Sequence, residues 1–300
     1  MKKSFSTKYG SAYNSSIEDF LDSKEGKALH GKVQLIFTSP PFPLVVPKKY
    51  GNKIGEDYLN WMAELSPKLT KLLKPNGSMV IEIGNAWDKG VPTMSTLPLK
   101  TLMAIAESAD LKICQQLIWH NNAKLPGPAT WVNVRRERVT DSFTHIWWYS
   151  PSEHPKANNT RVLQPYKDGM VKLLRKKKYN AGTRASGHNI SETGFLKKNK
   201  GAIPASAIIM ANTSVDPNYS AWCKKKGIDI HPARMPIGLA DFFIKFLTTP
   251  GDLVFDPFGG SCTTGKSAEE LKRNWICTEQ NSDYLLGAKG RFISNLKVVQ

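Results

Sequence analysis

Strand-like and helix-like segments alternate along most of this chain, and that alternation restricts the possible folds more than any other feature. Short apolar runs of strand type span Val33–Phe37, Ser78–Ile83, Leu111–Trp119, Ser142–Tyr149, Leu253–Phe255 and Trp275–Thr278. Helix-like apolar spacing begins at Tyr58 and recurs in Leu97–Ala109, in Leu239–Leu247 and near Ser267–Lys272. Strands that alternate with helices favour a mainly parallel sheet covered on both faces. We therefore predict an α/β fold.

One segment interrupts the alternation and carries about half of the net charge. Between Arg161 and Lys200, eleven basic residues are opposed only by Asp168 and Glu192, in a chain whose formal net charge is +17. The segment is rich in Gly, Ser, Asn and Thr and lacks helical apolar periodicity, which predicts a loop-rich insert. We place this insert at residues 151–230, between two halves of one domain at 1–150 and 231–300.

The basic insert indicates a polyanionic partner. Nucleic acid is favoured over a membrane surface, because a membrane-binding helix needs an apolar face opposite its lysines, and LLRKKKYNAG soon runs out of one. A solvated surface without a ligand is the alternative. The side chains expected to contact DNA are Arg135, Arg136, Arg138, Lys172, Arg175, Lys176, Lys177, Lys178, Arg184, His188 and Asn189.

The composition excludes several classes of protein. A hydrophobic fraction of 40% and a mean hydropathy of −0.36 indicate a soluble globular chain. No run reaches the roughly 18 apolar residues that span a bilayer, and the N-terminal lysines precede no apolar stretch, so we expect neither a membrane span nor a signal peptide. The four cysteines form no CxxC pair, which predicts reduced thiols in the cytoplasm and no metal site.

The first motif is FDPFGGSCTTGKS at Phe255–Ser267, a strand followed by glycines and a helix. Such a turn surrounds a ligand with backbone N–H groups. Gly260, Gly265, Lys266 and Ser267 also fit the phosphate-loop pattern, so a DNA-dependent P-loop ATPase is an alternative from another enzyme class. Asp256 counts against it, because its carboxylate would repel a triphosphate. No run of four apolar residues ends in an acidic metal ligand, and only 35 residues follow Gly265.

Two acidic residues around this loop favour a different ligand. Asp256 before the glycines suits a ligand that carries an amino group and a sulfonium. Glu279, at the end of the next strand, stands where dinucleotide-type folds bind ribose hydroxyls. The pair predicts an adenosyl ligand.

The second motif, Thr38-Ser39-Pro40-Pro41-Phe42, directly follows a strand-like run. Two prolines stiffen the backbone and remove N–H donors. The Ser39 hydroxyl and the Pro40 carbonyl are then acceptors beside the Phe42 ring, which suits the exocyclic amine of a planar base. A turn merely stiffened by proline is the alternative.

Together these motifs resemble the amino-group DNA methyltransferases that use S-adenosylmethionine, in which [DNST]-P-P-[YFW] is catalytic and D-P-F-x-G-[ST]-G-T-T binds the methionine part of the cofactor. The S-P-P-F form is typical of N4-cytosine enzymes. Here the catalytic motif comes first, as in the circularly permuted β class. Five further segments resemble the PvuII type of N4-cytosine methyltransferase: KKYGN at 48–52, LLKPNGS at 72–78, KLPGPATWVN at 124–133, SGHNI at 186–190 and HPARMP at 231–236.

The resemblance implies a Rossmann-like methyltransferase fold with a seven-stranded sheet and a smaller DNA-recognition insert. By position, Ser39, Pro40, Pro41 and Phe42 match the catalytic motif. The cofactor residues implied are Asp256, Pro257, Phe258, Gly259, Ser261, Thr263, Thr264 and Glu279. Cys262 stands where the family usually has Gly or Asn. Gly10-Ser11-Ala12 stands where it usually has G-D-[ST], so an aspartate contact to the adenine is missing.

The resemblance also implies the reaction, which is methyl transfer to N4 of a cytosine flipped out of double-stranded DNA. Glu82, at the end of a strand, is predicted to polarise the Ser39 hydroxyl; a carboxylate solvated at a strand end is the alternative. N6-adenine methylation is a further alternative. We expect a monomer that belongs to a restriction–modification system, with a cognate endonuclease that does not bind it stably.

Overall fold

The computed structural model describes residues 1–43, 53–213 and 216–293. The KKYGN segment at 48–52 lies outside these residues. The chain divides into two compact units: unit 1 comprises residues 1–157 and 206–300, and unit 2 comprises residues 158–205.

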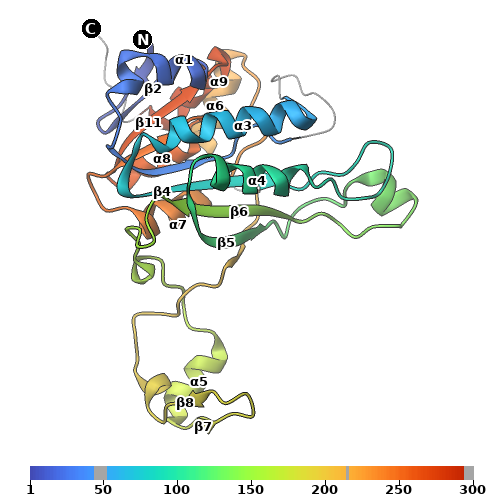
Figure 1. Ribbon diagram of the computed structural model, residues 1–300, viewed down its shortest axis with the longest axis vertical. Coiled ribbons are helices and arrows are strands. Elements are labelled where there is room, and N and C mark those ends of the chain that lie inside the picture. The colour runs from blue at the N-terminus through green and yellow to red at the C-terminus, as the bar shows by residue number, and fades with distance from the viewer. Residues whose placement is uncertain (44–52, 214–215, 294–300) are drawn as a thin grey trace. The chain divides into compact units, whose positions relative to one another are not determined.

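A mixed sheet forms the centre of unit 1, with nine strands among the described residues (Figure 1). The strands run in the order β1 (Lys3–Ser6), β2 (Gly10–Asn14), β11 (Asn274–Glu279), β10 (Leu253–Asp256), β3 (Val33–Thr38), β4 (Leu73–Gly84), β6 (Phe143–Ser150), β5 (Lys112–His120) and β9 (Ala207–Ile209). Every pair from β2 to β4 is parallel, as is β5 with β9. The pairs β1–β2, β4–β6 and β6–β5 are antiparallel.

The predicted α/β class with a mainly parallel sheet is confirmed, and the predicted count of seven strands is wrong for the described chain. The two additional strands are β1 and β9, which lie at opposite edges of the sheet. They have four and three residues, too few to display an alternation of apolar and polar positions. The strand-like runs predicted in the interior of the sheet all form strands. Half or more of the residues in β3, β4, β6, β10 and β11 are buried, whereas in β5 only Leu117 and Trp119 are.

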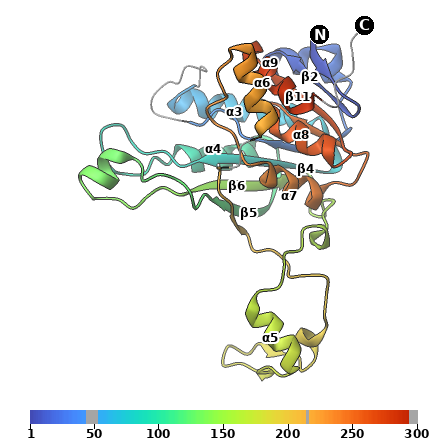
Figure 2. The same cartoon turned by 180° about the vertical axis from the view of Figure 1, so that it is seen from behind.

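Helices cover both faces of the sheet, and each face has its own apolar core (Figures 1 and 2). On one face lie α1 (Ile17–Asp22), α3 (Gly55–Thr70) and α4 (Leu97–Ser108), with Phe20, Met62 and Ile105 buried. On the other lie α7 (Ile237–Leu247), α8 (Thr263–Glu270) and α9 (Ser282–Ala288). The other helices described in this unit are α2 (Lys24–Lys27) and α6 (Pro217–Lys226), with a π-helical turn at Thr130–Val134 and a 3-10 turn at Lys289–Phe292.

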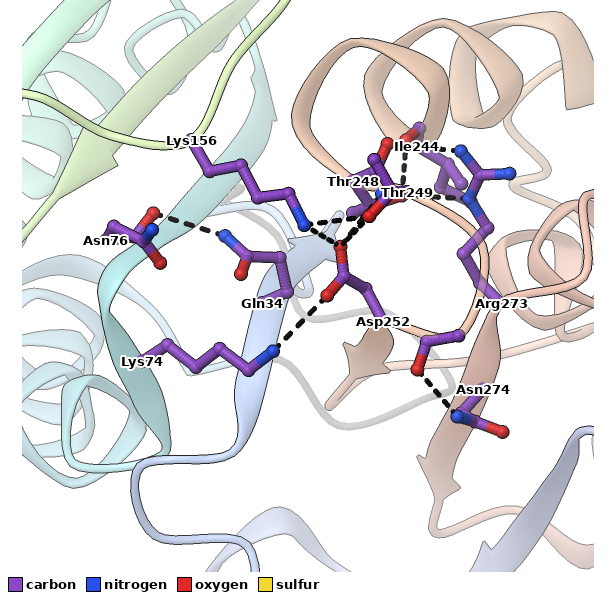
Figure 3. A network of polar contacts seen from close by, with 11 residues as sticks. Gln34, Lys74, Asn76, Lys156, Ile244, Thr248, Thr249, Asp252, Arg273 and Asn274 are labelled. Carbon is purple, nitrogen blue, oxygen red and sulfur yellow. Dashed lines mark hydrogen bonds and ion pairs between the residues drawn. The ribbon is translucent and has the colours of Figure 1, made fainter.

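A polar network ties together the amino ends of the central strands (Figure 3). Asp252, just before β10, accepts hydrogen bonds from Lys74 Nζ at 3.2 Å and from Lys156 Nζ at 2.6 Å. Its Oδ2 also accepts from the Thr249 N–H at 2.8 Å. The Asp252 carboxylate therefore joins β4, the turn before β10 and the last residues ahead of unit 2 to one another.

Unit 2 contains short elements: α5 (Asp168–Lys176), a hairpin of β7 (Gly182–Thr183) and β8 (Asn189–Ile190), and 3-10 turns at Asn159–Arg161 and Gly194–Leu196. The prediction placed an insert at 151–230, whereas residues 206–230 supply β9 and α6 to unit 1. The prediction also missed α5. Its first turn holds Asp168 and its last turn holds Arg175 and Lys176, an arrangement that complements the helix dipole.

Two further expectations concern membrane-spanning segments and the cysteines. Over the described ranges, no helix is both long enough and apolar enough to span a membrane. All four cysteines are free, with Cys114 half-buried and the other three buried.

Candidate active site

A cavity of about 270 Å³ lies at the carboxyl ends of β3 and β10 in unit 1. These strands are parallel neighbours, so the segments that follow them meet at one edge of the sheet. The cavity therefore brings together both sequence motifs, which are more than two hundred residues apart. Of the predicted residues it is lined by Ser39, Pro40, Pro41, Phe42, Asp256, Pro257, Phe258, Gly259, Ser261, Thr263, Thr264 and Glu279.

Ser39 and Glu82 form a hydrogen-bonded pair beside this cavity. The Ser39 hydroxyl donates to Glu82 Oε2 at 2.5 Å. The pair forms because β3 and β4 run parallel and in register, with Thr38 opposite Ile81, so the residue after β3 lies next to Glu82. Glu82 is buried at 2% exposure, so the structure does not support the alternative of a solvated carboxylate.

Burial is the largest influence on Glu82 and raises the pKa of its carboxyl, while the Ser39 and Thr144 hydroxyls and the charge of Lys124 act in the opposite direction. Its second oxygen, Oε1, is buried without a hydrogen-bond partner among the described residues. A carboxylate in this environment takes up a proton more readily than one in water.

Phe42 packs against the end of β4. A Cβ atom at Gly84 would lie 2.5 Å from Cε2 of the Phe42 ring, so only glycine leaves room for the ring there. Gly84 follows Glu82 by two residues on the same strand. The strand that carries the carboxylate therefore also determines where the aromatic ring lies.

Asp256 links the two motifs. The Thr38 hydroxyl donates to Asp256 Oδ1 at 2.6 Å, and the Phe258 N–H donates to the same oxygen at 3.1 Å. Burial raises the pKa of Asp256, against the effect of these donors and of the Thr264 hydroxyl. No ion pair to Asp256 occurs in the described part of the chain.

The glycine turn depends on its backbone geometry. Gly260 has a φ of +49°, and a Cβ at Gly259 would lie 2.9 Å from Cβ of Cys277 on β11. Cys262 also has a positive φ, of +53°, directly before α8. This is an unusual conformation for a residue with a side chain. The departure from the family pattern at Cys262 therefore falls at the most constrained position of the turn.

The phosphate-loop alternative does not fit this geometry. Helix α8 begins at Thr263, so Gly265 and Lys266 lie inside the helix and not in the loop before it. Lys266 Nζ pairs with Glu270 at 3.0 Å and lies over the Phe292 ring, outside the cavity lining. A phosphate-binding lysine has to point into the loop.

Glu279 closes the other side of the turn. Its Oε2 accepts from the Gly260 N–H at 2.9 Å, and its Oε1 accepts from the Asn281 N–H at 2.8 Å. Burial raises the pKa of Glu279, and the charge of Asp256 adds to this rise, while three backbone N–H groups oppose it. The cavity thus has a buried acidic group, Asp256, and a half-buried one, Glu279, which suit a ligand that brings positive charge.

Sequence reasoning looked for the missing adenine contact at Gly10-Ser11-Ala12, and the structure corrects that position. Gly10 to Ala12 lie within β2, where Gly10 packs closely against Trp275. The cavity is instead lined by Ser15 and Ser16, between β2 and α1. A sequence signal for this place exists, since Ser16 caps α1 by accepting from the Asp19 N–H, a spacing typical of helix starts.

Several other lining residues were not predicted. Trp61 of α3 donates to Glu18 Oε1 at 2.6 Å and packs edge-on against Phe258. His231, from the HPARMP segment, lies 3.0 Å from where a Cβ at Gly260 would be, and burial lowers its pKa to about 4, so it is neutral at pH 7. These contacts depend on tertiary packing. The HPARMP segment resembles the family, but nothing in the sequence placed His231 beside Gly260.

Arg291 supports the turn from behind. Its guanidinium donates to the Ser261 carbonyl at 2.8 Å, to Ser261 Oγ at 3.1 Å and to Asp216 at 3.0 Å. This buried fork of hydrogen bonds holds the turn against the end of the chain's last described helical segment. The role was missed because Arg291 has no motif neighbours.

The predicted DNA-contacting residues fall in two places. Arg135, Arg136 and Arg138 belong to the β5–β6 connection of unit 1. Arg135 and Arg136 are exposed, whereas the Arg138 side chain is only 18% exposed and binds Asp141 with both carboxylate oxygens. The others lie in unit 2, where all but the half-buried Arg184 are exposed: Lys172, Arg175, Lys176, Lys177, Lys178, Arg184, His188 and Asn189.

Comparison with known proteins gives consistent matches. The family profile described as DNA methylase matches residues 33–290. The chain is 40% identical to the type II methyltransferase M.PvuII of Proteus hauseri, over 98% of this chain and 87% of that protein. It is 23% identical to M.SmaI of Serratia marcescens, over 86% and 83% of the two chains. The solved cytosine-N4-specific PvuII DNA methyltransferase superposes with a TM-score of 0.77 at 34% identity, covering 97% of this chain and 89% of that one.

Proposed function

Because this chain belongs to the DNA methylase family, we propose that it transfers a methyl group from S-adenosylmethionine to the N4 amine of a cytosine flipped out of double-stranded DNA. We further propose that it is the modification enzyme of a restriction–modification system. It acts in the cytoplasm as a monomer, and its cognate endonuclease shares the DNA sequence without binding it stably.

One observation carries this proposal. The Ser39 hydroxyl donates to the buried Glu82 and lies in the same cavity as the glycine turn of Asp256–Thr264. The Ser39–Glu82 pair suits the handling of an exocyclic amine, and the glycine turn suits an adenosyl ligand. An enzyme of this class needs both within reach of one another.

The residues around the cavity fit S-adenosylmethionine. When bound, this cofactor supplies a methyl group on a positively charged sulfur. Asp256 is buried and Glu279 is half-buried, both are acidic, and Gly260 directs its N–H toward Glu279. We propose that Asp256, Phe258, Ser261 and Thr263 hold the amino-acid end of the cofactor. Glu279 holds the ribose hydroxyls, as acidic residues do at this position in related folds.

The chain's own groups then prepare the cytosine. Because the Ser39 proton points to Glu82, the lone pairs of Ser39 Oγ can accept one N–H of the target amine. The Pro40 carbonyl accepts the second, and Phe42 keeps the ring flat. As the amine acquires the methyl group it loses a proton to Ser39 Oγ, whose own proton moves to Glu82. Burial has already raised the pKa of Glu82, which favours this acceptance.

The decisive experiment is sequencing that detects modified bases in DNA from cells that express the protein. We expect N4-methylcytosine at one short sequence, and none in cells that express Ser39→Ala. Modified adenines in place of cytosines would contradict the choice of base and favour the N6-adenine alternative. Unmodified DNA, from a protein that is folded and present, would contradict the proposed function as a whole.

A further inference from the structure

The most exposed large apolar side chains in the described residues lie on the connection between β5 and β6, residues 121–142, which we call the arm. Leu125, Val134 and Val139 are 83%, 76% and 87% exposed. An exposed leucine without neighbours is common on protein surfaces, so exposure alone carries no argument. The position and rigidity of the arm are what distinguish Leu125.

The arm begins at the edge of the sheet that carries the catalytic pair. In the register of the sheet, Gly84 lies opposite Thr144, and His120 lies opposite Phe143. The arm leaves the sheet between His120 and Phe143, next to the end of the strand that carries Glu82. In Figures 1 and 2 it extends from the same end of the sheet as the connection after β4. Lys124, the neighbour of Leu125, is close enough to Glu82 for its charge to oppose the rise that burial causes in the pKa of that carboxyl.

The arm is also held in a defined shape. Arg138 binds both carboxylate oxygens of Asp141, at 2.9 and 3.1 Å, and donates to the Pro92 carbonyl of the neighbouring connection. The Asp141 N–H donates to the Gly127 carbonyl at 3.1 Å, and Asn133 donates to the Pro126 carbonyl at 3.3 Å. Leu125 itself stands directly before Pro126, which restricts its backbone. A backbone held in this way loses little conformational entropy on binding.

The charge around Leu125 indicates the partner. The arm carries Lys124, Arg135, Arg136 and Arg138 against Glu137 and Asp141, and Arg138 already neutralises Asp141. An exposed apolar side chain on a held backbone with nearby cations, at the edge of a site that acts on a base, matches the way proteins enter a nucleic acid stack. Apolar wedges separate stacked bases while cations hold the phosphates on either side.

We propose that Leu125 is the wedge that enters the DNA stack at the place which the target base leaves. This inference rests on the proposed function, because it needs a flipped base. It assigns a task to the KLPGPATWVN segment that the catalytic and cofactor motifs leave unexplained. Arg138 then serves to fix the arm, while Lys124, Arg135 and Arg136 contact phosphates.

The test compares two duplexes that carry the sequence found modified in cells, one with the target base paired and one with it mispaired. A mispaired base is already weakly stacked, so it needs the wedge less. For Leu125→Ala we expect kcat/KM to fall ~10- to 100-fold on the paired duplex and less than ~3-fold on the mispaired one. Leu125→Met, which keeps an apolar side chain of similar length, should stay close to wild type on both.

Val139→Ala is the matched control, since Val139 is equally exposed on the same arm and has no assigned task. It should leave both duplexes unaffected. An equal loss for Leu125→Ala on the two duplexes, or the same loss for Val139→Ala, would overturn the wedge. Neither result bears on the proposed function. That function as a whole fails only if the wild-type protein modifies no base, and this outcome would overturn the wedge as well. A Leu125→Ala protein with unchanged activity on the paired duplex also contradicts the wedge.

Discussion

At the scale of single residues, the buried Glu82 gives the site a dependence on pH. In the proposed mechanism Glu82 must be a carboxylate to receive the Ser39 proton, and burial raises its pKa above the usual value near 4.5. kcat should therefore rise with pH through a limb centred above that value. Glu82→Gln should lower kcat by ~10²- to 10⁴-fold and remove this limb. The measurement is a single-turnover pH profile with DNA and cofactor saturating.

The matched control for this prediction is Glu107→Gln, an exposed glutamate on α4. It should leave the profile unchanged. If Glu82→Gln keeps near-normal turnover, Glu82 does not accept the proton, and its burial beside Ser39 has only a structural meaning.

A second prediction at this scale concerns Gly84. Ala at this position would place Cβ 2.5 Å from the Phe42 ring and force the ring to move. Because small misplacements of reacting groups are costly, we expect kcat to fall by about 10- to 100-fold. Affinity for S-adenosylmethionine, measured by calorimetry, should not change, since the glycine turn is elsewhere. Gly169→Ala, where a Cβ meets open space, serves as the control; a loss of cofactor affinity in Gly84→Ala would contradict the idea that the change is confined to Phe42.

At the scale of elements, the network around Asp252 joins three parts of unit 1 through one carboxylate. Burial opposes ionisation, but Lys156, the Thr249 N–H and hydroxyl, and Lys74 together lower the pKa of Asp252 below its usual 3.8. The ionised form therefore adds stability at neutral pH, and this contribution is lost as pH falls through the lowered pKa. We expect Asp252→Asn to reduce the free energy of unfolding at pH 7 by about 1–3 kcal/mol.

Denaturant titrations at pH 7 and near pH 3 measure this effect. The difference between wild type and Asp252→Asn should narrow at the acidic pH, because the carboxyl of the unfolded chain, with its usual pKa of 3.8, is then mostly protonated, which favours unfolding of the wild type. Asp110→Asn is the matched control, since that carboxylate pairs with Lys112 at 3.5 Å but is 97% exposed. Its effect should be small at both values of pH. A constant difference for Asp252→Asn would contradict the role of the charge.

The elements also show how far sequence reasoning reaches. Runs such as Val33–Phe37 predict their strands because both faces are buried, which requires continuous apolar residues. The strand β9 was not predicted because it is short. The basic helix α5 was not predicted because its many charges obscure its apolar positions. The two motifs were recognisable because chemistry restricts their residues. Ser16, His231 and Arg291 were not predicted. The packing of distant segments brings Ser16 and His231 to the cavity and Arg291 to the back of the glycine turn.

At the scale of the whole molecule, the charge of +17 predicts binding of DNA that weakens steeply with salt. Neutralising Lys176, Lys177 and Lys178 of unit 2 should reduce the slope of log K against log salt by up to about three, without a change in the methylated base. Binding measured by fluorescence anisotropy over a range of salt concentrations tests this. Neutralising Lys224, Lys225 and Lys226 of α6 removes the same charge from unit 1. Equal slopes in the two variants would mean that only net charge matters.

The order of strands in the sheet has a consequence for how the protein is made. Strands β10 and β11 come late in the chain, yet they fill the gap between β2 and β3, which emerge from the ribosome early. Until residues 253–279 have been synthesised, the edges of β2 and β3 that face this gap have no partner strand. Unpaired strand edges favour aggregation. A nascent chain that stops before this point would contain Ser39 but lack the glycine turn of Asp256–Thr264. In the proposed mechanism, methylation can therefore begin only after residues 253–279 have been synthesised.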